Sequence, residues 1–250
     1  MPTAIIDTAA ALLAERTEPG RPRRLSDLLA CTETRPASVY LADAAAARAG
    51  DTDRPLYTAY RDILTPRRTP DGPWFADLVV YEPGSLPGGE LHRSTGHWNT
   101  PCQLEIFQCL TGRVLMLTAI EGPSGPQVRY QECDPGDLAA VPFGAWHLTL
   151  VLDGPAAVFN LYTDVPGLAQ VGHSSRAAAK EPRLKYARPP LALTALADGD
   201  GYRLSGADEL VAAARAAEPP SWIGTADLPG FFTAASATEL RALTRRALPT

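Results

Sequence analysis

The middle of this 250-residue chain alternates short apolar runs with turn signals, and that pattern limits the folds open to it. Clusters of Pro and Gly such as TPDGP, EPGSLPGG, DPGD and LDGP divide the region into short pieces. The pieces between them are rich in Val, Ile, Phe and Tyr, which favours strands: residues 74–81, 104–110, 113–120, 127–132 and 156–163. The LTG sequence at 110–112 predicts a tight hairpin between two of these runs. Many short strands with regular turn signals indicate a mainly β sandwich or barrel.

The two ends of the chain have a different character, because their apolar residues recur at helical spacing. Helices are predicted at residues 3–16, 24–31, 38–49, 207–217 and 237–247. Ser236 and Glu239 have the spacing of a capping box ahead of the last helix. We therefore predict a helical lead-in over residues 1–55, a β-barrel over 56–187 and a helical extension over 188–250.

Composition excludes several functional classes. With 23 basic and 28 acidic residues the net charge is -5, which gives nucleic acid no generic basic face to bind. The four cysteines lack CxxC spacing, so reduced thiols in a cytoplasmic protein are expected. The N-terminal segment lacks the basic start of a signal peptide, and no run of about 18 apolar residues predicts a membrane span.

Two stretches contain candidate metal ligands. In STGHWNTPCQLEIF, residues 94–107, His97 and Asn99 share one face of a strand because side chains alternate. Glu105 opens the next apolar run, and His147 follows the DPGD turn inside DLAAVPFGAWHLTLV. A closed antiparallel sheet can bring inward residues of distant strands to one point. Two imidazoles and one carboxylate suit a divalent first-row metal with open coordination positions.

The same stretches carry a family resemblance. The pattern GHWN-x5-E-x6-G followed by PGDLAAVPFGAWH resembles the two cupin motifs, and more narrowly those of the cupin-type glucose-6-phosphate isomerases. The segments RRLSDLLA, PLYTAYRD and AAVFNLYTD extend the likeness over residues 22–187. The resemblance implies a cupin double-stranded β-helix, that is, a jelly-roll barrel, and a homodimer.

For the metal, the resemblance implies that His97, Glu105 and His147 match three of the family's ligands. Asn99 stands where the family has its second His. An Asn can bind metal through its amide oxygen, but it is a weaker and harder donor than imidazole. One divalent ion per chain, Fe, Mn, Zn or Ni, is the cofactor that this set implies.

For the substrate, Ser94 and Gly96 match the segment that contacts phosphate in the family, and Tyr57 matches a Tyr near the sugar. Phe107 replaces a family Tyr. The family's later GHDYG element is not reproduced, so His173 receives no role.

Other polar residues near these motifs have plainer interpretations. Cys102 can act as a substitute soft ligand, although Cys is more often a small buried apolar residue. His92 lies five residues before His97, so alternation directs it to the opposite face. Trp98 and Trp146 are predicted to pack in the core. Three arginines can offer charge to an anionic substrate, although exposed Arg on strands usually has no such role: Arg93, Arg113 and Arg129.

Together these features predict a metal-dependent isomerase of the aldose–ketose type, acting on a phosphosugar or another sugar-like small molecule. The predicted catalytic residues are Glu105, His147 and Tyr57, and the predicted substrate-binding residues are Ser94, Gly96 and Asn99. Two alternatives remain open. One is a non-haem metal-dependent oxygenase or lyase, which uses the same donor set. The other is a non-catalytic small-molecule-binding cupin.

Overall fold

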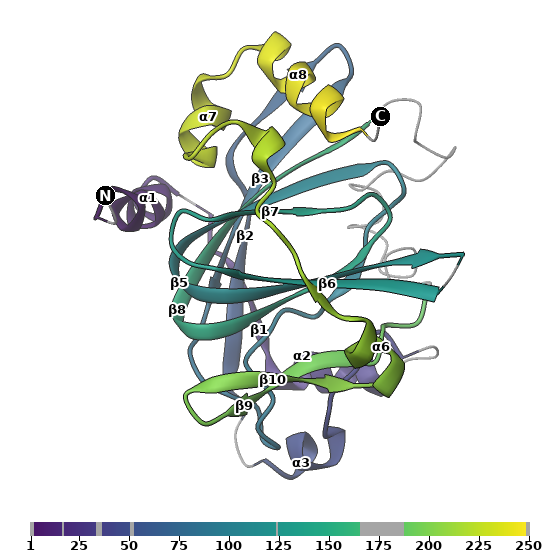
Figure 1. Ribbon diagram of the computed structural model, residues 1–250. Coiled ribbons are helices and arrows are strands. Elements are labelled where there is room, and N and C mark those ends of the chain that lie inside the picture. Colours follow the sequence, from purple (N-terminus) through teal and green to yellow (C-terminus); the bar gives the residue numbers. More distant parts are fainter. Residues whose placement is uncertain are drawn as a thin grey trace.

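A computed structural model (Figure 1) describes residues 3–16, 18–33, 37–50, 53–123, 125–165 and 188–248. Its strands are β1 (Arg21–Arg24), β2 (Pro55–Thr69), β3 (Gly72–Tyr81), β4 (His97–Trp98), β5 (Gln103–Gly122), β6 (Gly125–Cys133), β7 (Leu138–Val141), β8 (Trp146–Asp164), β9 (Leu193–Asp198), β10 (Gly201–Gly206) and β11 (Arg215–Ala216). Its helices are α1 (Thr3–Ala14), α2 (Leu25–Glu33), α3 (Ala44–Ala49), α6 (Asp208–Ala213), the 3-10 helix η1 (Ser221–Ile223), α7 (Leu228–Ala234) and α8 (Ala237–Ala247).

The sheet is organised around two long strands, β5 and β8, which pair antiparallel along nearly their whole length. The strand order is β1-β2-β3-β8-β5-β6-β11, with β4 added on β8 and β7 added on β5. The β5–β8 register shifts between Cys109 and Val114, so each strand is divided into two parts. The first part of β5 and the second part of β8 pair with each other and with β7 and β3, and we call this sheet the β3 half. The second part of β5 and the first part of β8 pair with each other and with β6 and β4, and we call this sheet the β6 half.

The predicted hairpin at 110–112 is wrong, because β5 runs through these residues without reversing. Gly112 has φ +67°, and a Cβ there would lie 2.7 Å from the backbone oxygens of both Asp153 and Pro155. Gly112 therefore allows a bulge at which β5 passes close to β8. The LDGP turn signal at 152–155 likewise lies inside β8, opposite this bulge.

The two halves face each other across a central apolar core. Phe107, Cys109 and Val158 enter it from the β3 half, and Val114 and Met116 enter it from the β6 half. Before the register shift the inward-facing residues of β5 have odd numbers, and after it they have even numbers. The shift therefore keeps the same side of the bent strand facing the core. This is the two-sheet arrangement of a jelly roll, and the predicted mainly β fold with helical extensions is confirmed.

The outer faces of the two halves are covered in different ways. Trp74 and Phe159 of the β3 half pack against Phe232 of α7 and Leu240 of α8. The outer face of the β6 half, which includes Trp146, is covered by the β9–β10 hairpin and α6. Figure 1 shows α7 and α8 at one end of the molecule and the hairpin at the other. The segment after residue 188 therefore covers both outer faces.

The helices differ from the sequence prediction mainly at their ends. The helix predicted for 38–49 begins only at Ala44, where the Asp43 side chain accepts a hydrogen bond from the Ala46 N–H and caps it. The helix predicted for 207–217 ends at Ala213, because Arg215–Ala216 pairs with β6 as β11. The capping box of Ser236 and Glu239 is confirmed.

Both extensions also contribute strands, namely β1 before the barrel and β9, β10 and β11 after it. The limits of the three predicted segments, 1–55, 56–187 and 188–250, stay a prediction. Within the described ranges, no helix is long and apolar enough to cross a membrane.

Candidate metal centre

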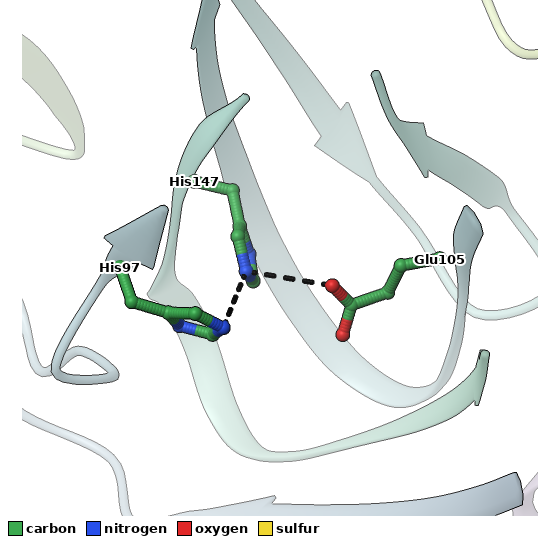
Figure 2. Close-up of side chains that lie close together, drawn as sticks. All are labelled: His97, Glu105 and His147. Atoms are coloured by element: carbon green, nitrogen blue, oxygen red, sulfur yellow. Dashed lines mark hydrogen bonds and ion pairs between the residues drawn. The ribbon is translucent and has the colours of Figure 1, made fainter. Parts of the chain in front are cut away.

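The two predicted histidine ligands are placed by the pairing of β4 with β8. His97 and His147 lie directly opposite each other, so their side chains leave the sheet on the same face. Their Nε2 atoms are 3.2 Å apart (Figure 2). The neighbouring Trp98 and Trp146 point the other way into the outer core of the β6 half, as predicted.

Glu105 reaches the histidines from the β3 half, across the interior of the barrel (Figure 2). Its Oε2 lies 3.5 Å from His147 Nε2. The ligand atoms of His97, Glu105 and His147 all lie within 4.8 Å of one another. Metal–ligand bonds of about 2.0–2.2 Å place neighbouring ligand atoms about 3 Å apart. The group therefore fits a divalent metal ion, with two nitrogen donors and one oxygen donor.

Three side-chain amides surround the Glu105 carboxylate. Oε2 accepts hydrogen bonds from Asn99 Nδ2 at 2.6 Å and from Gln103 Nε2 at 3.0 Å. Oε1 accepts one from Asn160 Nδ2 at 2.6 Å. An ionised carboxylate can only accept hydrogen bonds, so each amide must present its NH2 group to Glu105.

In this arrangement the side-chain amide oxygens of Asn99 and Asn160 accept no hydrogen bond from the described residues. Both Oδ1 atoms are buried and have no hydrogen-bond partner among the described residues. Such atoms usually find a partner in a folded protein, so each marks a place where a ligand or an ion can bind. Asn99, 5% exposed, lies at the site on the side of His97, as alternation predicts. Whether it binds a metal stays a prediction.

Two predicted substrate-binding residues, Ser94 and Gly96, and the predicted catalytic residue Tyr57 have the following places in the structure. Ser94 Oγ accepts the backbone N–H of Thr149 at 3.1 Å, and the Ser94 side chain also hydrogen-bonds to Tyr81. The Tyr57 hydroxyl lies 2.8 Å from Thr95 Oγ1. Gly96 has φ +72°, and a Cβ there would lie 3.3 Å from the backbone oxygen of His147. The positive backbone angle favours glycine, and a Cβ would in addition be a tight fit against this oxygen.

Phe107 forms an apolar wall at the site. The Phe107 ring is buried, and its centroid lies 5.7 Å from that of His147. Cys102 is not part of the group formed by His97, Glu105 and His147. Its thiol is buried and donates to Asp164 Oδ1 at 3.5 Å, and burial raises its pKa. The interpretation of Cys102 as a small buried residue is therefore confirmed.

His92 also lies outside the group, as alternation predicts. It is buried, and its Nδ1 is 2.9 Å from the Glu82 carbonyl oxygen. His173 lies outside the described residues.

The three arginines that the sequence suggested as partners of an anionic substrate have different surroundings. Arg93 is buried rather than exposed, donates to Glu90 Oε1 at 2.6 Å, and also donates to the backbone oxygens of the two residues that follow it. It therefore supports the loop before His97. Arg113 donates to Glu132 at 2.8 Å on the outer surface. Arg129 lies on β6 in register with β11.

Four polar residues near the site were missed from the sequence: Arg61, Asp77, Gln103 and Asn160. Asp77 is buried on β3 and forms an ion pair with Arg61 NH1. Asn160 lies opposite Asp77 on β8. A signal did exist, because one polar residue interrupts each of the apolar runs WFADLVVY and AAVFNLYT. A polar residue at an inward position of a buried strand needs a partner and so points to a site.

Comparison with known proteins assigns no family. No family model matches the chain, and no curated protein matches it. Among solved structures, a cupin-superfamily sugar phosphate isomerase from Silicibacter pomeroyi aligns at 17% identity over 61% of this chain and 77% of that one, with a TM-score of 0.31. KdgF from Halomonas sp. aligns at 18% identity over 46% and 85%, with a TM-score of 0.31.

An oxalate oxidase in complex with glycolate aligns at 16% identity over 38% of this chain, with a TM-score of 0.31. The alignment spans only 44% of that oxidase chain. Identities and TM-scores this low carry no argument about family or reaction, so the function has to be argued from the site.

Proposed function

We propose that the chain is a metal-dependent isomerase of the aldose–ketose type, acting on a phosphosugar or a similar polar sugar derivative. The observation that carries the proposal is the convergence of His97, Glu105 and His147, whose ligand atoms lie within 4.8 Å of one another. A divalent first-row metal bound there would polarise the carbonyl and hydroxyl oxygens of neighbouring substrate carbons.

The residues of the chain divide the remaining tasks among them. His97, Glu105 and His147 hold the ion. Glu105 is fixed by three amide donors, so its carboxylate keeps one orientation during binding. Asn99 either remains one of those donors or turns its amide and offers its buried Oδ1 as a weak ligand.

Substrate contacts come from the loop before β4 and from β2. The Ser94 hydroxyl, the Gly96 backbone amide and the Tyr57 hydroxyl are neutral donors for the oxygens of a polyol. Proton transfer between neighbouring carbons is assigned to Glu105 or His147, with Tyr57 holding the substrate. The apolar ring of Phe107 beside His147 helps to exclude water from this place.

Metal analysis and hydrogen exchange test the proposal together. Purified protein supplied with Fe, Mn, Zn or Ni is expected to bind close to one ion per chain. It should also exchange the C2 hydrogen of an aldose or ketose phosphate, followed by NMR. Glu105→Gln and His147→Ala should each weaken metal binding by about a hundredfold or more, because affinity rests on a few directed ligands.

The matched control is His92→Gln, which alters a buried His outside the metal-binding group and should leave metal binding unchanged. Protein that ignores all four metals contradicts the site. Metal binding without exchange across a panel of sugar phosphates contradicts the isomerase. Oxygen uptake with Fe(II) would then favour the oxygenase, because the same two-His, one-carboxylate set suits that chemistry. The homodimer also stays a prediction, which sedimentation tests directly.

A further inference from the structure

Arg61 lies on β2 with its guanidinium between the barrel interior and solvent. Its NH1 group donates to Asp77 Oδ2, and the Asp77 side chain is only 2% exposed. The Arg61 side chain is 42% exposed. The other Asp77 oxygen accepts the backbone N–H of Asp62 at 2.8 Å, so the carboxylate is held from both sides. Asp77 thus fixes one edge of the guanidinium, while the side chain remains open to solvent.

This ion pair lies one strand position away from a side chain that holds Glu105. Asp77 and Asn160 lie directly opposite each other on β3 and β8. Side chains in such positions start about 5 Å apart and share one face of the sheet. Asn160 in turn donates to Glu105 Oε1 at 2.6 Å. Arg61 is therefore separated from Glu105 by only two side chains along the inward face of the β3 half.

The electrostatics agree with this placement. Burial alone would lower the pKa of Arg61, but the Asp77 carboxylate, with further contributions from Tyr162 and Glu105, more than offsets that effect and raises it. Glu105, a predicted metal ligand, is among the groups that raise the pKa of Arg61.

The Arg61–Asp77 ion pair is expected to contribute little to the free energy of unfolding. A carboxylate that is almost fully buried loses its hydration, and pairing it with an arginine usually does little more than compensate for that loss. An apolar residue at position 77 would suit the strand WFADLVVY as well. The arrangement does fix a positive charge beside the site.

Among the described residues, the other groups predicted or observed near the site do not supply such a charge to a ligand. Ser94, Gly96 and Tyr57 are neutral donors. Arg93 is fully buried and is already neutralised by Glu90. A substrate phosphate or carboxylate held by neutral donors alone would lack a counter-charge in a region of low dielectric.

We propose that Arg61, oriented by Asp77, is the anion-binding residue of this site. It receives an oxyanion, a phosphate or a carboxylate, at the end of the substrate remote from the metal-binding group. The planar guanidinium matches both anions and can donate two parallel hydrogen bonds to either. The inference rests on the proposed function. It narrows the substrate class to molecules that carry an anionic group at the end remote from the metal-binding group.

Binding of matched ligand pairs tests the inference. The metal-loaded protein is titrated by calorimetry with a sugar phosphate, the corresponding sugar acid and the uncharged parent sugar. Arg61→Gln should weaken binding of the preferred anionic ligand at least tenfold and leave the parent sugar and the metal content unchanged. Arg61→Lys keeps the charge but loses the planar fork, so it should fall in between. Whether the phosphate or the acid is preferred identifies the anion.

Arg113→Gln is the control, because Arg113 is similarly exposed at 46% and ion-paired to Glu132 on the outer surface. Unchanged preference for the anionic ligand in Arg61→Gln overturns the inference and leaves the isomerase intact. If no sugar phosphate binds or exchanges, the isomerase fails, and inorganic phosphate and malonate are tested by thermal shift. Stabilisation that Arg61→Gln abolishes and Arg113→Gln retains then supports the anion site. No stabilisation of the wild-type protein overturns it.

Discussion

The interior of the barrel has two ends that are built from the same two strands. At one end, β5 and β8 contribute Glu105, His147 and Asn160, which are linked by hydrogen bonds or by short contacts. At the other end they contribute Val114 and Val151 to an apolar core. Backbone pairing continues through both ends, so the difference lies in the inward side chains alone.

The difference shows how one fold separates stability from function. Apolar side chains stabilise the barrel in proportion to the area that they remove from water. The polar end gains little in this way, because each buried polar group first loses its hydration. It gains instead a set of side chains with fixed orientations. Substitutions at the apolar end should therefore act on unfolding, and those at the polar end on binding.

The largest expected effect on unfolding is at the apolar end. Met116, 2% exposed, packs in the central core. Met116→Ala leaves a cavity there and should lower the free energy of unfolding by about 2–5 kcal/mol. Metal affinity should change less than about threefold once the protein is folded. Urea unfolding and metal titration below the melting temperature measure the two quantities. Loss of metal binding in a folded Met116→Ala protein would show that the two ends are coupled.

A smaller effect is expected from a substitution of Asn160 at the polar end, and it should act on metal affinity and not on unfolding. Asn160→Ala removes the donor to Glu105 Oε1 and should lower metal affinity by about 10–100-fold, as is typical when a residue that orients a ligand is lost. Gln108→Ala is the matched control. Gln108 is a buried amide on the outward face of β5, and its Oε1 accepts the Leu228 N–H at 2.8 Å. The control should lose stability and keep its metal affinity. Equal metal affinities in the two variants would remove Asn160 from the site.

The same contrast explains what the sequence could and could not reveal. His97, Glu105 and His147 were singled out because strand alternation, the turn before His147 and the resemblance to the cupin motifs can all be recognised in short stretches of sequence. The surrounding amides were missed because Gln103 and Asn160 meet Glu105 only after β5 and β8 have paired. The register of that pairing depends on tertiary packing and not on any short motif.

The errors in the fold have a related origin. Gly and Pro at LTG and LDGP signal a departure from regular strand geometry, and a bulge satisfies that requirement as well as a turn does. Choosing between them requires the partner strand, since Gly112 is needed for its close approach to Asp153 and Pro155. The predicted end of the helix at residue 217 was wrong for a similar reason. The helix ends at Ala213 because the residues that follow pair with β6 as β11.

The smallest expected effect concerns His92, a polar side chain placed beside the apolar end. Its backbone oxygen accepts the Val151 N–H at 2.8 Å, and its Nε2 is buried with no hydrogen-bond partner within the described part of the chain. Burial lowers the pKa of His92 below the usual value of 6.5. The unfolded chain therefore takes up a proton at a pH where the folded chain does not. The resulting contribution to stability is complete above pH 6.5 and is lost as the pH falls from there through the folded pKa.

His92→Gln should remove this dependence, so metal-free variant protein should lose less stability than metal-free wild-type protein between pH 7.5 and pH 5. One proton changes the free energy of unfolding by at most about 1.4 kcal/mol per pH unit. Urea unfolding across that range measures the difference, and His97 and His147 contribute equally to both proteins and cancel. Parallel curves for the variant and the wild type would show that His92 does not contribute to the acid sensitivity of the fold.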